Sequence, residues 1–167
     1  VDISLISSTA KENDIISIID NTFASPINQN PINFGIDLII HSASKYLGGH
    51  SDILAGSVSG AKDHIEKIKK SGINYGANLS DYTAWLLERS MKTLSVRVNA
   101  QNQNALQLAK FLDDNSLVKK VYYPGLKNHL SHDIACNQMN GFGGMMSFEV
   151  VDKINSEDFV SDLKIIS

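Results

Sequence analysis

The sequence predicts an α/β fold in which parallel strands form the sheet. Two short apolar runs rich in isoleucine, 15–19 and 38–40, are separated by a polar connection that contains two prolines. Continuous apolar strands are typical of parallel sheets covered on both faces, and the order strand, connection, strand favours this arrangement. Apolar residues at three- and four-residue steps over 85–94 indicate the helices that such a sheet requires.

The first half of the chain is expected to alternate helical and extended segments. β-branched apolar runs predict the strands, proline and amide residues predict a loop, and glycines mark the ends of helices. In order, we expect a helical lead over 1–13, a buried strand over 15–20, a loop over 21–31, a short helical segment ending at Gly35, a second buried strand over 37–42, a third strand over 53–60 and a surface helix over 61–71 stopped by Gly72.

The second half is expected to begin with two helices, the first of them capped by Ser80. Charge and periodicity change after the second helix, and we place a domain boundary near Arg97. In order, we expect helices over 81–94 and 95–115, a strand over 118–122, a turn at 123–125, a helix over 132–139 and a strand over 145–151.

Three groups of side chains are assigned to the interior from their spacing. They are Trp85 with Leu86, the helix face formed by Val98, Leu106, Leu108 and Phe111, and Cys136 among Ile134, Ala135 and Met139.

Composition narrows the functional class. The 167 residues are 43% hydrophobic and carry 15 Lys and Arg against 18 Asp and Glu, a net charge of −3. Because both signs are scattered, we expect no nucleic-acid or anionic-lipid surface. The single cysteine excludes an intrachain disulfide and favours the reducing cytoplasm. No apolar run reaches the ~20 residues of a membrane helix, so no membrane association is expected.

The two ends suggest a longer polypeptide. The chain starts with Val1 instead of methionine and stops at Ser167 within an amphipathic run, 159–166. We therefore expect this stretch to be one part of a larger protein.

A polar turn, Ser42-Ala-Ser-Lys45, follows the second predicted strand and permits three interpretations. Its hydroxyls and amine suit a phosphate and an aldehyde, and strand ends are where α/β proteins bind ligands. The second interpretation is a solvated turn with a surface lysine. The third, a Ser-x-x-Lys hydrolase, is disfavoured because Leu47-Gly-Gly would break the required helix and no Ser-Asp-Asn element is present.

Asp20 closes the first predicted strand, where an unpaired buried carboxylate would be costly. Its partner is either an amide or backbone donor in the following loop or a protonated ring nitrogen on a bound cofactor. Thr22 points to the same side as Asp20 as long as the chain stays extended. If the two strands are neighbours, Asp20 and Ser42 end side by side.

These residues belong to longer motifs that resemble one enzyme family. The motifs are Ile19-Asp-Asn-Thr-Phe-Ala-Ser-Pro26, His41-Ser-Ala-Ser-Lys-Tyr-Leu-Gly-Gly-His-Ser-Asp52, Tyr123-Pro-Gly-Leu126 and Gly141-Phe-Gly-Gly-Met-Met-Ser-Phe-Glu149. Together they resemble the Cys/Met-metabolism family of pyridoxal-phosphate enzymes. That family includes cystathionine γ-synthase, cystathionine β- and γ-lyases, methionine γ-lyase and O-acetylhomoserine sulfhydrylase.

The resemblance implies a role for each site residue. Lys45 would be the Schiff-base lysine, which holds pyridoxal 5'-phosphate as an internal aldimine and then moves protons. Asp20 would pair with the pyridine nitrogen, Ser42 and Ser44 would bind the phosphate, and Thr22 would line the ring. The implied reaction is elimination or replacement at Cβ or Cγ of a sulfur amino acid or activated homoserine, with cystathionine chemistry favoured over methionine γ-lyase or sulfhydrylase activity.

The resemblance also implies an architecture. The fold would be the aspartate-aminotransferase type (fold type I), with 1–97 completing the large cofactor domain and 98–167 opening the smaller C-terminal domain. The family assembles as homo-oligomers, dimers of dimers. Its remaining site residues lie outside the matched motifs, so we expect this stretch alone to be inactive. The alternative from another class is a non-catalytic α/β domain whose serine-rich turn binds a phosphate ligand.

The other polar residues are given structural interpretations. Arg89 and Arg97 are expected to form structural ion pairs. We interpret His129 and His132 as surface residues and expect no metal site. Gly141-Phe-Gly-Gly144 precedes a strand rather than a helix, so it predicts a tight turn and not a dinucleotide loop.

Overall fold

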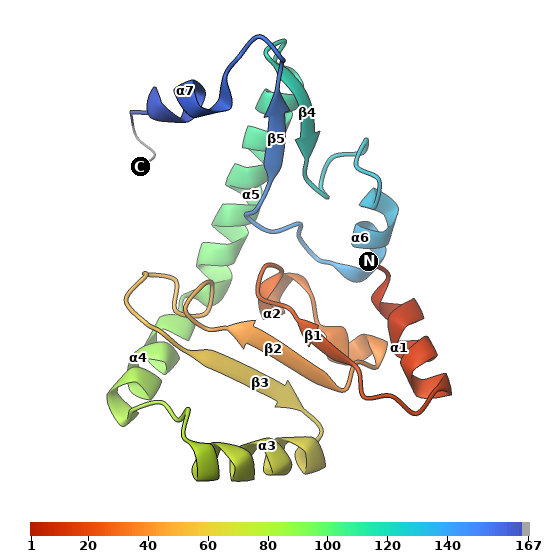
Figure 1. Ribbon diagram of the computed structural model, residues 1–167, viewed down its shortest axis with the longest axis vertical. Coiled ribbons are helices and arrows are strands. Elements are labelled where there is room, and N and C mark those ends of the chain that lie inside the picture. The colour runs from red at the N-terminus through yellow and green to blue at the C-terminus, as the bar shows by residue number, and fades with distance from the viewer. Residues whose placement is uncertain (165–167) are drawn as a thin grey trace.

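The computed structural model describes residues 1–164, which form two sheets connected by one long helix (Figure 1). In chain order the elements are α1 (Ile3–Glu12), β1 (Ile18–Asp20), α2 (Ser25–Asn28), the 3₁₀ helix η1 (Pro31–Phe34), β2 (Leu38–Ser42), β3 (Gly56–Gly60), α3 (Lys62–Tyr75), α4 (Asp81–Met91), α5 (Leu94–Asp113), β4 (Val118–Tyr122), α6 (His132–Gln138), β5 (Ser147–Val150) and α7 (Ser156–Ser161).

The first sheet has the order β1-β2-β3. β1 and β2 are parallel, as predicted, with Asp20 opposite Ile40. β3, whose direction the sequence left open, pairs with β2 in the antiparallel direction. The connection over 43–55 contains turns and no assigned helix, whereas a parallel neighbour requires a long crossover.

A shared hydrogen-bond cluster ties the starts of β1 and β2 together. Asp37 Oδ2 accepts from Ser17 N at 2.8 Å and from Ser17 Oγ at 2.7 Å, while Asp37 N donates to Ser17 Oγ at 3.0 Å. These bonds from the Ser17 backbone and hydroxyl lower the pKa of Asp37 against the opposing effect of burial. The cluster therefore fixes the strand register that places Asp20.

This cluster predicts an acid-dependent stability. Because the folded-state pKa of Asp37 lies below its unfolded value, its contribution is fully present above about pH 4 and is lost as the pH falls through the folded pKa. Asp37→Asn should weaken the pH dependence of the urea midpoint in the acid range and lower the midpoint at neutral pH. An unchanged neutral midpoint would show that the cluster contributes nothing to stability.

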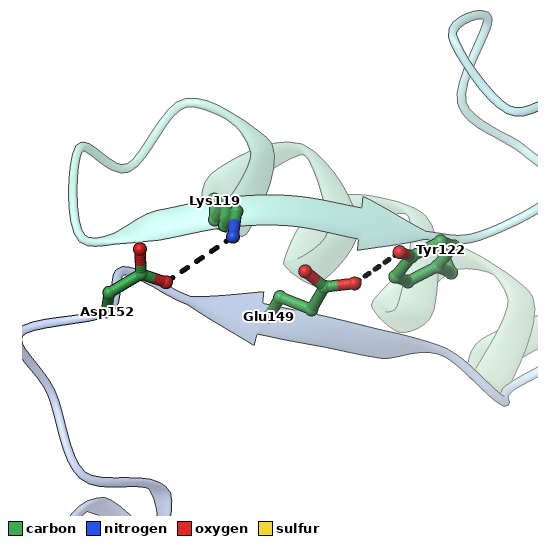
Figure 2. A network of polar contacts seen from close by, with 4 residues as sticks. All are labelled: Lys119, Tyr122, Glu149 and Asp152. Carbon is green, nitrogen blue, oxygen red and sulfur yellow. Dashed lines mark hydrogen bonds and ion pairs between the residues drawn. The ribbon is translucent and has the colours of Figure 1, made fainter.

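The second sheet pairs β4 with β5 in the antiparallel direction. Figure 2 shows two contacts of β4, one from the Tyr122 hydroxyl to Glu149 on β5 and one from Lys119 Nζ to Asp152, which lies just beyond the end of β5, at 3.4 Å. The α5 helix packs against this sheet through Ala105 and Ala109, which are 6% and 0% exposed. Small side chains allow the helix to approach the strands closely.

Several predicted core positions are wrong. Leu108 and Phe111 on α5 are exposed, because the alanine face of the helix turns toward the sheet and leaves them outside. Trp85 is 55% exposed, whereas Leu86 packs partly buried against the core. Cys136 is exposed as well, since α6 turns Ala135 inward instead.

The first predicted strand also differs in burial and length. It covers only Ile18–Asp20, and Ile15, Ile16 and Ile18 are exposed. β1 is also an edge strand among the described residues, paired on one side only, and Ile15 and Ile16 lie before it. The continuous apolar run therefore predicts the presence of the strand correctly but not the burial of its side chains.

Most other elements lie where the spacing predicts, with shifted ends. Gly72 does not stop α3, which continues to Tyr75 and ends at Gly76 with φ +91°. The predicted loop over 21–31 contains the one-turn helix α2. The Ser80 cap is confirmed by a 3.1 Å bond from Thr83 N, but α4 ends at Met91.

Two predictions concern larger divisions of the chain. The boundary near Arg97 falls within α5, and the division into 1–97 and 98–167 stays a prediction. Of the amphipathic run 159–166, residues 165 and 166 lie outside the described part. In the described residues, no helix has the length and apolar character that crossing a membrane would need.

Candidate functional site

Three of the predicted site residues meet where β1 and β2 end. Asp20 Oδ1 accepts from Thr22 N at 2.9 Å, and Thr22 Oγ1 accepts from Ser42 N at 2.7 Å. The ladder continues past β1, because Asn21 N donates to Ile40 O at 2.8 Å. The expectation that neighbouring parallel strands would bring Asp20 beside Ser42 is thus confirmed.

The surroundings of Asp20 differ from the buried setting that we expected. Its carboxylate is exposed, so the argument from an unpaired buried charge does not apply. Hydrogen bonds from the Thr22 side chain and backbone lower the pKa of Asp20, with a smaller contribution from His41 and an opposing one from burial. Asp20 is therefore a fixed anion at neutral pH, suited to a cationic partner.

Thr22 does not continue the strand as an extended residue. A turn begins there, and the side chain is 7% exposed. Its hydroxyl joins the two strand ends by accepting from Ser42 N. Thr22 consequently stays in contact with Asp20 through the turn instead of through strand alternation.

Lys45 lies in a turn that starts directly after β2. Lys45 N donates to Ser42 O at 3.2 Å, and Gly49 N donates to Lys45 O at 2.7 Å, so the segment coils back on itself. The Lys45 side chain is exposed. An exposed amine at a sheet edge is accessible to an aldehyde, as the predicted role requires.

Ser44 is already engaged within the chain. Its Oγ accepts from Ala55 N at 2.9 Å and approaches Ala55 O at 3.3 Å. These bonds fasten the Lys45 turn to the segment that leads into β3. The Ser44 hydroxyl thus holds the turn in place. To bind a phosphate, it would have to give up a hydrogen bond to Ala55.

Two adjoining cavities flank these residues. Lys45 and Ser44 line a cavity of about 1000 Å³, and Asp20 lines another of about 560 Å³. Phe23 and Met145 line both cavities, so the two share a wall. Asp20 and Lys45 therefore lie at the same end of the sheet but line two neighbouring cavities.

Arg97 holds the Lys45 turn, a role that the sequence did not indicate. Its Nη1 donates to Tyr46 O at 2.8 Å, and its Nη2 donates to Ser90 O at 3.0 Å and to Leu47 O at 3.4 Å. The predicted ion pair is wrong, because the guanidinium binds backbone carbonyls of two separate segments. Gly49 has φ +78°, a backbone conformation that favours glycine, and it lies against the Arg97 guanidinium.

We expect Arg97→Met to destabilise the protein by about 2–3 kcal/mol, because its charged hydrogen bonds to three backbone carbonyls are lost and the Tyr46 and Leu47 carbonyls lose this donor. Urea unfolding measures this loss. Arg89→Met is the matched control, since Arg89 is exposed and forms no ion pair within residues 1–164, and it should change stability by less than about 0.5 kcal/mol. Equal effects of the two variants would contradict the assigned role of Arg97.

Gln101 is a second residue that the sequence did not single out. It lies on α5 and lines the same cavity as Lys45. Its Oε1 is buried and has no hydrogen-bond partner among the described residues. Gln101 is one of many polar residues in a polar helix, so the sequence gives no indication that its side chain faces the cavity.

The remaining polar candidates lie away from the strand ends. His132 Nδ1 is 2.8 Å from Pro124 O, and its Nε2 is 3.4 Å from Cys136 Sγ. Arg89 does not form the predicted ion pair within the described part of the chain. The glycine segment 141–144 precedes β5, as predicted, but it contains bends instead of an assigned turn, with Gly143 at φ +81°.

Comparisons with known proteins agree with the motifs. The model of the Cys/Met metabolism PLP-dependent enzyme family matches residues 1–167. Cystathionine beta-lyase of Lactococcus lactis subsp. cremoris (strain MG1363) is 46% identical over 164 residues, which is 98% of this chain and 43% of that protein. Chloroplastic cystathionine gamma-synthase 1 of Nicotiana tabacum is 46% identical over 166 residues, 99% of this chain and 31% of the relative.

Solved structures give the same result. The crystal structure of cystathionine gamma-lyase from Lactobacillus plantarum, complexed with L-serine, matches with a TM-score of 0.96 and 43% identity. The match covers 100% of this chain and 44% of that chain. Cystathionine gamma synthase from Xanthomonas oryzae pv. oryzae, in complex with cystathionine, matches with a TM-score of 0.89 and 36% identity, over 92% of this chain and 40% of that one.

The chain therefore spans less than half the length of these relatives. The expected α/β architecture of fold type I is confirmed, and the non-catalytic phosphate-binding alternative is not favoured. From the motifs, the strand-end geometry and these matches, we conclude that the chain belongs to the Cys/Met metabolism family of pyridoxal-phosphate-dependent enzymes.

Proposed function

We propose that this chain supplies the cofactor-holding strand ends of a pyridoxal-phosphate-dependent trans-sulfuration enzyme of the cystathionine γ-synthase or cystathionine lyase type. The observation that carries the proposal is the hydrogen-bonded series Asp20–Thr22–Ser42, with Lys45 on the turn that follows. Relatives with these names match nearly the whole chain.

The chemistry of the side chains fits pyridoxal 5'-phosphate. Lys45 offers an exposed primary amine for its aldehyde, and Asp20 offers an ionised carboxylate for its ring nitrogen. The half-buried Ser42 offers a hydroxyl for its phosphate, and Ser44 offers a second if it releases Ala55. Thr22 would line the ring from its position beside Asp20.

Bound pyridoxal phosphate supplies an electron sink that stabilises negative charge on substrate carbons. Within that reaction, the Asp20 carboxylate holds a proton on the ring nitrogen through an ionic hydrogen bond. The Lys45 amine would hold the cofactor through its aldehyde, and as a base and acid it would accept a proton from the substrate Cα and donate one at a neighbouring atom. Thr22 N–H keeps the Asp20 carboxylate in place during these steps.

The substrate and assembly are also proposals. The names of the relatives point to a sulfur amino acid or an activated homoserine as substrate. We propose a homo-oligomer, a dimer of dimers, on the family resemblance alone. The cytoplasmic compartment stays a prediction that rests on the single cysteine, and one relative is named as chloroplastic.

A chimera tests the proposal. Residues 1–167 replace the matching 164 residues of Lactococcus lactis cystathionine beta-lyase, so that the relative supplies the rest of the enzyme. We expect the chimera to bind pyridoxal phosphate and to cleave cystathionine with water into homocysteine, pyruvate and ammonia.

The same chimera with Lys45→Ala is the matched control and should form no pyruvate. A folded chimera that neither binds the cofactor nor forms pyruvate would contradict the proposal. Release of 2-oxobutyrate together with cysteine would show that this segment shifts cleavage to the γ carbon, and would still support the proposed class.

A further inference from the structure

A layer of buried polar side chains lies directly behind the Asp20–Thr22–Ser42 series. Asn21, Gln29 and His41 are 2%, 7% and 7% exposed. Side chains alternate along a strand, and the parallel ladder continues to Asn21. Asn21 and His41 therefore project from the face opposite to Asp20 and Ser42.

The amide of Asn21 is the centre of this layer. Its Nδ2 lies 3.0 Å from Gln29 O, 3.3 Å from Ser25 O and 3.2 Å from His41 Nε2. Its Oδ1 accepts from Gln29 Nε2 at 2.8 Å. Every polar atom of the Asn21 side chain thus has a partner from another part of the chain.

These contacts determine the state of His41. Asn21 Nδ2 has two N–H groups shared among three acceptors, and an amide nitrogen cannot accept. Where it bonds to His41, the ring Nε2 is therefore the acceptor, in a neutral imidazole protonated on Nδ1. Burial lowers the pKa of His41, which agrees with a neutral ring, although the charge of Asp20 opposes this shift. The Asn21 side chain is therefore held by hydrogen bonds in several directions. Such a network restricts the motion of Asn21 more than an apolar contact of the same size would.

The place of Asn21 in the chain connects this network to the candidate site. Asn21 lies between Asp20 and Thr22, and the Thr22 N–H that holds the carboxylate belongs to the next peptide unit. Rotation of the backbone at Asn21 would move that N–H away from Asp20. The anchored Asn21 side chain prevents such a rotation.

We propose that Asn21 is a positioning residue, held by Gln29 and His41, which fixes the direction of the Asp20 carboxylate and thereby sets the affinity of the site for pyridoxal phosphate. This inference rests on the proposed function, which supplies the ring that Asp20 faces. Asn21 itself touches neither cofactor nor substrate in this account.

The matched variants are Asn21→Ala and Asn28→Ala. Asn28 is also 2% exposed and lies in the same connection, but its side chain bonds to Asn102 on α5, at 2.9 Å and 2.7 Å. Both variants remove a buried amide and lower thermal stability. Only Asn21→Ala removes the support behind Asp20.

The first readout needs no cofactor. NMR titration of the Asp20 carboxyl group should show its pKa returning toward the ordinary value in Asn21→Ala, because the Thr22 donors are no longer held, and staying lowered in Asn28→Ala. An Asp20 titration in Asn21→Ala that matches the parent chain would overturn the positioning role.

The second readout is the dissociation constant for pyridoxal phosphate, from the amount fixed on Lys45 by borohydride. Asn21→Ala should weaken binding by about tenfold, as for one charged hydrogen bond out of place, and Asn28→Ala by less than about twofold. Equal weakening by both variants would overturn the inference. These dissociation constants are measured in the chimera, where the relative supplies the rest of the enzyme. If the chimera without these substitutions takes up no cofactor, the proposed function fails, and the Asp20 titration alone decides the positioning role.

Two His41 variants keep the test decisive if Asn21→Ala does not fold. His41→Gln can keep an acceptor near the position of Nε2, and it should retain the part of the Asp20 pKa lowering that comes from the Thr22 hydrogen bonds. His41→Leu removes the acceptor and should behave as expected for Asn21→Ala. Identical Asp20 titrations in the two His41 variants would overturn the inference.

Discussion

Replacing Lys45 by alanine abolishes the capture of pyridoxal phosphate and lowers turnover of the chimera by at least about a thousandfold. The expected loss is large because one amine forms the covalent link and also moves protons, and positioned acid–base groups alone contribute about 10²–10⁴-fold. Borohydride capture and pyruvate formation measure the two effects separately.

Lys62→Ala is the matched control for Lys45. Lys62 is an exposed lysine on α3 whose surface pair with Glu66 spans 3.7 Å, and such pairs contribute little. Lys62→Ala should leave capture and turnover unchanged. If Lys45→Ala retained both properties of the parent, the assignment of Lys45 would be wrong.

The second large effect is expected for Asp20→Asn. Asparagine keeps an oxygen to accept from Thr22 N–H but loses the charge that holds the ring proton. We expect turnover to fall by roughly a hundredfold, about 2.7 kcal/mol, which is within the range for a hydrogen bond to a charged group. Cofactor affinity should fall in parallel.

The pH profile sharpens this prediction. Because hydrogen bonds with Thr22 lower the pKa of Asp20, the carboxylate stays charged from neutral pH to below about pH 4. The loss in Asp20→Asn should therefore be constant over the neutral range. Asp63→Asn is the control, since Asp63 is an exposed carboxylate on α3 that does not touch the site, and a loss of turnover equal to that of Asp20→Asn would contradict the assigned role.

The spacing of apolar residues predicts the order and type of most helices and strands. It does not predict which of their side chains are buried. The apolar run before Asp20 predicts a strand correctly, yet whether Ile15 and Ile18 are covered depends on neighbours that periodicity does not report. On α5, Leu108 and Phe111 look more apolar than Ala105 and Ala109. The alanines are buried because close helix–sheet contact favours small residues.

The candidate site, too, could be predicted only in part from the sequence. The motifs around Asp20 and Lys45 are contiguous in sequence, so the strand ends and their chemistry could be predicted. Arg97 lies about 50 positions from the turn that it holds, and no local pattern indicates contact with backbone carbonyls. The link from Asn21 to His41 likewise forms only when β1 and β2 pair.

Peptide mass mapping after borohydride reduction is the most direct test of the account. The protein is treated with less than one equivalent of pyridoxal phosphate, reduced and digested. The account predicts that the label is on Lys45 and that Asp20→Asn lowers its yield. A label on other lysines, or one spread evenly over the surface, would show that these strand ends do not form the cofactor site.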